Sequence, residues 1–98
     1  MNPVIADRLA SLHIQLLSEG DKVFLFARDT CVALVERRET GIGSIGSTGV
    51  MTETGLAYLV WRDGQAKLVG KGGEQAAADA QVEAVRRFSE DLKAALGV

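Results

Sequence analysis

The sequence predicts an α+β fold, a two-layer sandwich in which N- and C-terminal helices pack on one face of an antiparallel sheet. Apolar residues recur at helical spacing near both ends of the chain, and two β-rich stretches between them are typical of hairpins. The expected order is helix, hairpin, Gly-rich loop, hairpin, helix. This gives four strands, or five if residues 48–52 add a short one. The 98 residues are expected to form one domain, residues 1–98.

The clearest hairpin covers residues 56–70, where Asp63-Gly64 separates two apolar runs. Both central residues of a type I′ turn need a positive φ, which Gly adopts freely and Asp tolerates. A two-residue turn fixes the register, and side chains then alternate between the two faces. The core face is expected to hold Ala57, Leu59, Trp61, Ala66 and Leu68. The second face is expected to hold Tyr58, Val60, Arg62, Gln65, Lys67 and Val69.

A second hairpin is predicted over residues 22–38, with its turn at Arg28-Asp29-Thr30. If Asp29-Thr30 is the turn, one face collects Phe24, Phe26, Ala33 and Val35. The other face then collects Leu25, Ala27, Val32 and Leu34. Both faces are apolar, which is typical of strands that are central or covered on both sides. The sequence leaves open which of them meets the helices.

Two helices are expected at the ends of the chain. Asn2-Pro3 suits a helix start, and the first helix is predicted over residues 3–18 with an apolar stripe of Ile5, Leu9, Leu12 and Leu16. The second is predicted over residues 74–96 with a stripe of Val82, Val85, Phe88, Leu92 and Leu96. The alanines at its start favour a helix, and Gly97 suits its end.

Residues 40–55 contain the pattern Gly-x-Gly-x-x-Gly and are expected to form a loop. A dinucleotide site is strongly disfavoured because no helix can follow the pattern and the chain lacks a βαβ unit. The amides and hydroxyls of this stretch could instead form an anion-binding nest. The candidate ligand-binding residues are Gly41, Gly43, Ser44, Gly46, Ser47 and Thr48. The competing interpretation is a flexible connector or a glycine-rich strand transition.

The composition argues against several classes of protein. The net charge is −2 and the Lys and Arg residues are scattered, which disfavours nucleic-acid binding. A single Cys excludes an internal disulfide and fits a reducing compartment. The N-terminus lacks a secretory pattern, and no apolar run approaches the ~20 residues that cross a bilayer. We therefore expect a soluble cytoplasmic protein with no membrane association.

The chain has one His and one Cys, His13 and Cys31, and nothing in the sequence brings them together. A buried structural cysteine and a helix-surface histidine are commoner than a thiol–imidazole pair, and the two do not make a zinc site. We therefore predict no catalytic residues, no metal and no cofactor. An aromatic binding platform of Trp61, Tyr58 and Phe24 or Phe26 is less favoured than core and interface packing.

Counting apolar faces predicts a homodimer. Two helices can cover only one face of the sheet, and the uncovered face would exceed the apolar patch that monomers usually expose. The interface is expected to combine Tyr58, Val60 and Val69 with either Phe24, Phe26 and Val35 or Leu25, Val32 and Leu34. The expected function is a small cytoplasmic interaction or regulatory module, with a further protein partner allowed. The alternative is a small-ligand or phosphate-binding domain using residues 41–49.

Overall fold

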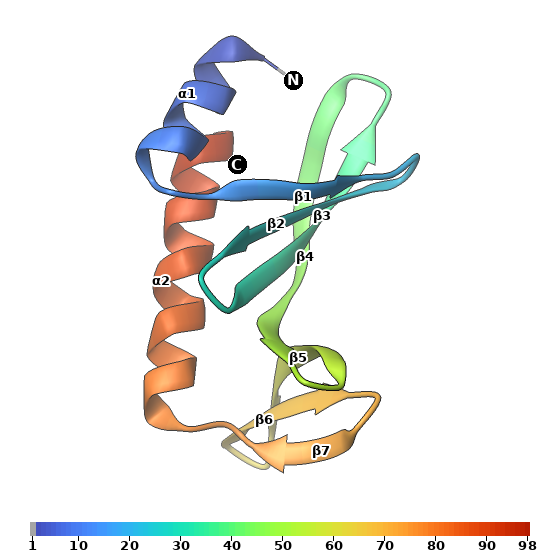
Figure 1. Ribbon diagram of the computed structural model, residues 1–98, viewed down its shortest axis with the longest axis vertical. Coiled ribbons are helices and arrows are strands. Elements are labelled where there is room, and N and C mark those ends of the chain that lie inside the picture. The colour runs from blue at the N-terminus through green and yellow to red at the C-terminus, as the bar shows by residue number, and fades with distance from the viewer. Residues whose placement is uncertain (1) are drawn as a thin grey trace.

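The computed structural model describes residues 2–98, which form two helices and one seven-stranded antiparallel sheet (Figure 1). Helix α1 spans Pro3–Ser11 and helix α2 spans Asp79–Leu96. The strands are β1 (Gln15–Glu19), β2 (Val23–Arg28), β3 (Cys31–Arg38), β4 (Gly41–Thr52), β5 (Gly55–Arg62), β6 (Gln65–Gly70) and β7 (Gly73–Ala76). They lie in chain order, each hydrogen-bonded to the next, so the sheet is a continuous meander.

The predicted sandwich with four or five strands is wrong, although the fold is α+β and has a helix near each end of the chain. The additional strands come from three segments that the sequence assigned differently. Strand β1 occupies the last four residues of the predicted first helix, residues 15–18. Strand β4 occupies the predicted Gly-rich loop, and β7 occupies the start of the predicted second helix.

The first helix is shorter than predicted because the chain turns sharply at His13. Helix α1 ends at Ser11, and His13 has a positive φ of 59°. The amide of Ile14 then donates to the carbonyl oxygen of Leu9 at 2.9 Å, which closes the end of the helix. Leu16 matches the helical spacing of the stripe, but it lies in β1, beyond this turn.

The Gly-rich stretch is the longest strand of the sheet, β4, with 12 residues. Its register with β3 shifts twice, because residues 43–44 and 46–47 each add one residue relative to the facing part of β3. Such bulges bend a strand, and Gly is common in them. Gly43 and Gly46 therefore allow one long strand to run from the upper to the lower part of the molecule in Figure 1.

The start of the predicted second helix belongs to the sheet instead. Residues Gly73–Ala76 pair with β6 as the edge strand β7, and the Ala77 amide donates to a β6 carbonyl at 3.1 Å. Helix α2 begins only at Asp79, where the Gln81 side chain accepts from the Ala78 amide at 2.8 Å. Pairing with β6 thus outweighs the helix propensity of the alanines, which is a weak preference.

Both predicted hairpin turns are confirmed. Asp63 and Gly64 have positive φ values of 52° and 76°, and β5 pairs with β6 in the expected register throughout. Asp29 has a φ of 53°, and β2 pairs with β3 around Asp29 and Thr30 as the turn. These two turns therefore fix which side chains share a face in four of the seven strands.

The face of the first hairpin that meets the helices carries Phe24, Phe26, Ala33 and Val35, all of which are buried. Both helices lie on this side of the sheet (Figure 1). The main core is completed by Leu9, Ile14, Cys31, Val50, Ala57, Leu68, Val85, Phe88, Leu92, Ala95 and Leu96. The expectation that Phe24, Phe26 and Val35 lie at an interface with Tyr58 is corrected, because alternation puts Tyr58 on the opposite face.

Trp61 lies on the predicted face, but its predicted burial is wrong. Its cross-strand partner is Ala66, on the same face as the buried Leu68, yet the Trp61 side chain is 64% exposed. The reason is the position of α2, which contacts β3 and β4 most closely within the sheet. The Trp61 end of the β5–β6 hairpin lines a groove beside α2, and the helix does not cover the indole.

Candidate functional site

The open face of the sheet, meaning the face turned away from both helices, is crossed by one row of directly paired residues. The row contains one residue from each strand, in order Gln15, Ala27, Val32, Gly49, Tyr58, Val69 and Glu74. Paired residues in an antiparallel sheet point to the same side. The row is therefore polar at both ends and apolar or aromatic along its middle, apart from the glycine at its centre.

Several apolar side chains of the open face are buried or half-buried. Ala27 and Val32 are 7% and 1% exposed although neither belongs to the core under the helices. Tyr58, Val60 and Val69 are half-buried, as are Leu25 and Leu34. Each of these side chains therefore exposes only part of its apolar surface. Met51, which is paired with Leu56, is 45% exposed on this face.

Charged residues border the apolar row on the side of β5 to β7. The guanidinium of Arg62 pairs with the carboxylate of Glu74 at 2.7 Å, and this pair bridges β5 to β7 over the intervening strand. Lys67 is half-buried opposite Val60. The open face thus has an apolar centre with charges at its margin, an arrangement common at protein interfaces.

The six residues of the expected anion nest lie in the extended strand β4, not in a loop. Successive amides in a strand point to opposite sides, whereas a nest needs them to converge. The six residues are therefore spread along the strand. Gly41 and Thr48 pair with β3, whereas Gly43, Ser44, Gly46 and Ser47 lie in its two bulges. The Ser44 amide, freed by a bulge, faces the Glu36 carboxylate at 3.5 Å, which is an acceptor and would repel an anion. Thr48 lines a groove beside α2.

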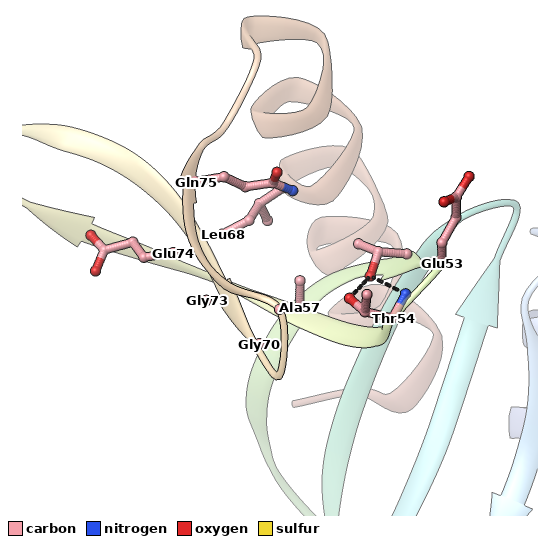
Figure 2. A pocket seen from close by; sticks show the side chains of 10 residues that line it. Glu53, Thr54, Ala57, Leu68, Gly70, Gly73, Glu74 and Gln75 are labelled. Carbon is pink, nitrogen blue, oxygen red and sulfur yellow. Dashed lines mark hydrogen bonds between the residues drawn. The ribbon is translucent and has the colours of Figure 1, made fainter.

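A pocket of about 430 Å³ lies between the β4–β5 turn and the β6–β7 turn (Figure 2). Ala57 and Leu68 form its apolar floor. The hydroxyls of Thr52 and Thr54 lie 3.1 Å apart, and Thr52 also donates to a backbone carbonyl at 2.7 Å. Glu74 is turned away from the other labelled side chains and pairs on the open face. Most polar groups here are engaged by the protein, so we assign no ligand to this pocket.

Another groove of about 370 Å³ lies between α2 and strands β4 and β5. Its sheet wall includes Leu59 and the exposed Trp61, and its helix wall includes Val82, Val85 and Lys93. Sequence reasoning missed this groove because it placed Trp61 in the core. No local pattern could have revealed it, since its two walls come from segments about 20 residues or more apart whose packing is tertiary.

His13 and Cys31 do not form a reactive pair. The Cys31 side chain is buried at the start of β3, and burial raises the pKa of its thiol, which keeps it protonated and weakly nucleophilic at neutral pH. His13 is exposed in the turn after α1. Within residues 2–98, no three His, Cys, Asp or Glu side chains gather closely enough to hold a metal ion.

Neither α1 nor α2 combines the length and the apolar character that a membrane-spanning helix needs. Comparisons with protein-family models, with curated proteins and with solved structures found no match to this chain.

Proposed function

We propose that this protein is a small interaction module that acts as a homodimer through the open face of its sheet. The supporting observation is the polarity of the row that crosses all seven strands. A two-fold axis through the middle of this row would place its apolar residues on those of the second copy and its polar ends on polar ends. A self-complementary surface of this kind fits two-fold symmetry, which is the commonest arrangement of soluble oligomers.

The margin of the open face suits the same arrangement. A standard interface buries about 800 Å² per partner and has an apolar centre with a polar rim. Tyr58 lies close to the middle of the row and is the natural anchor, because Tyr contributes strongly to binding when its ring is buried. The Arg62–Glu74 ion pair and Lys67 would stay at the rim, where water still solvates charge.

The distribution of basic groups supports a protein partner over a nucleic acid. Six guanidinium groups are paired with carboxylates, those of Arg28, Arg37, Arg38, Arg62, Arg86 and Arg87. Neutralised in this way, they offer little attraction to phosphates. We further propose a cytoplasmic setting, which the single buried cysteine supports because reducing compartments keep such thiols free.

The test is sedimentation equilibrium of the wild type and of Val60→Asp across low to high micromolar concentration. Val60 is half-buried on the open face, so an aspartate there would leave an unpaired charge in the interface. We expect a wild-type dimer and a folded Val60→Asp monomer. Val4→Asp is the matched control, since it makes the same chemical change on α1 at a side chain that is 55% exposed.

A wild type that sediments as a monomer at every concentration would disprove the dimer. If the dimer persists in Val60→Asp as it does in Val4→Asp, the interface must lie on a surface other than the open face. Circular dichroism of each variant would separate dissociation from unfolding, since an unfolded variant loses its strand signal.

A further inference from the structure

The groove between α2 and β5 combines an apolar floor with an unusually exposed aromatic wall. Val85 is 2% exposed at its base, and Leu59 and Val82 are half-buried beside it. Trp61 forms the outer wall and is 64% exposed. A ligand that covered the indole would bury a large apolar area. Pockets that bind small ligands typically enclose about 300–1,000 Å³. The volume of this groove, about 370 Å³, suits a small molecule.

The charges on the helix wall are not balanced. Arg86 is held by two carboxylates, Glu83 and Glu90, each at 2.6 Å, and Arg87 pairs with Glu83 at 3.0 Å. The two arginines and the two glutamates therefore balance in charge. Lys93, which lies about two turns after Arg86 on α2, lines the same groove and is exposed. Among residues 2–98, no carboxylate lies within ion-pair distance of the Lys93 ammonium. The groove therefore carries one uncompensated positive charge beside an apolar floor.

We propose that this groove binds small organic anions with an apolar body, of the class of medium-chain alkyl or aryl carboxylates. The apolar body would lie against Trp61 and Val85, and the carboxylate would pair with Lys93. The site is independent of the proposed dimer, because it lies on the helix side of the sheet and the dimer uses the open face.

The experiment uses the single Trp of the chain as a reporter of the groove. Intrinsic fluorescence is recorded while octanoate, octylamine or octanol is added to the wild-type protein. These probes share their chain length and differ in charge. We expect octanoate to change the emission at the lowest concentration and octylamine at the highest, because only the carboxylate can pair with the ammonium group of Lys93.

Lys93→Gln removes the charge and keeps most of the length of the side chain. It should weaken octanoate binding about tenfold, which corresponds to about 1.4 kcal/mol, and leave octanol binding unchanged. Lys71→Gln is the matched control, since Lys71 lies in the β6–β7 turn outside the groove. It should bind all three probes as the wild type does.

Three outcomes would overturn the proposal. The first is no change in Trp61 emission with any probe, which would mean that nothing binds beside the indole. The second is equal affinity for octanoate and octylamine. The third is equal effects of Lys93→Gln and Lys71→Gln, which would show that general charge, not this groove, attracts the anion.

Discussion

At the scale of single residues, exposure decides what a large side chain contributes to stability. Phe26 and Trp61 are both aromatic and both lie on the helix side of the sheet, but Phe26 is fully buried and Trp61 is 64% exposed. Phe26→Ala should therefore lower the free energy of unfolding by roughly 3–5 kcal/mol, because it leaves a cavity. Trp61→Ala should lower it by less than about 1 kcal/mol, as surface substitutions usually do.

Urea unfolding followed by far-ultraviolet circular dichroism measures both variants without relying on Trp fluorescence. A loss for Trp61→Ala as large as that for Phe26→Ala would mean that the indole is buried in solution. In that event the groove beside α2 would be closed by Trp61 itself.

Gly49 is a second position where one atom matters. A Cβ at this position would overlap the backbone carbonyl of Ala57 on the neighbouring strand, and a backbone obstacle cannot rotate away. We expect Gly49→Ala to destabilise the protein by about 3 kcal/mol, at the upper end of the usual cost of overpacking. The matched control is Gly46→Ala, whose Cβ would lie 3.3 Å from the Leu34 carbonyl oxygen.

Thermal unfolding of the two glycine variants makes the comparison directly. The midpoint of thermal unfolding should fall much further for Gly49→Ala than for Gly46→Ala. The close contact of a Cβ at position 46 with the Leu34 carbonyl oxygen can be relieved by a small shift. Equal midpoints would show that β4 and β5 can separate locally without cost to the sheet.

At the scale of elements, α2 carries a charge cluster that links its stability to pH. Hydrogen bonds from Arg86 and Arg87 lower the pKa of the Glu83 carboxyl from 4.5 to about 2. Because the pKa is lower in the folded state, the contribution of Glu83 is fully present above pH 4.5 and is lost as the pH falls toward 2. The group is on the surface, so solvent and salt screen this contribution and keep it small.

Glu83→Gln should therefore lower the urea midpoint at neutral pH, and the difference from the wild type should shrink as the pH falls from 4.5 toward 2. Glu53→Gln is the control, because Glu53 is exposed in the β4–β5 turn and makes no ion pair within residues 2–98. A difference for Glu83→Gln that stays constant with pH would assign its effect to helix propensity, not to the ion pairs.

At the scale of the whole molecule, the sheet separates two surfaces. The open face holds Tyr58 and Val60, and the groove beside α2 holds Trp61 and Lys93. Substitutions at sites without shared partners usually have additive effects. Val60→Asp should therefore abolish the dimer while leaving the response of Trp61 to octanoate unchanged, as measured by the same fluorescence titration. A coupled loss of both would mean that the two surfaces are linked through β5.

The turns and the alternation of the hairpins could be predicted from the sequence because they depend on neighbouring residues. Asp63-Gly64 and Asp29-Thr30 set the two registers, and strict alternation then sorted Phe26 from Leu25 and Leu68 from Val69. The end of α2 at Gly97, with a φ of 74°, follows from the same local chemistry. Each of these depends on φ preferences and side-chain period, which a short segment expresses by itself.

The number of strands could not be predicted, because it depends on which partner each segment finds. The glycines near Gly43 weaken a strand locally, and only pairing with β3 and the bulges that bend β4 make this stretch extended. Likewise, Ala76 favours a helix in isolation but pairs with Lys67 of β6. Local preference amounts to less than about 1 kcal/mol per residue for most residue types, so a ladder of backbone hydrogen bonds overrides it.

The sequence by itself thus determined the two hairpins, their faces and the helical character of the ends of the chain. Only the tertiary structure decided which first-hairpin face meets the helices and that Trp61 stays exposed beside α2. The physical reason is that alternation determines which residues share a side of the sheet, whereas burial depends on where a helix distant in the sequence packs. The groove at Trp61 exists because α2 packs over β3 and β4 and leaves one flank of β5 uncovered.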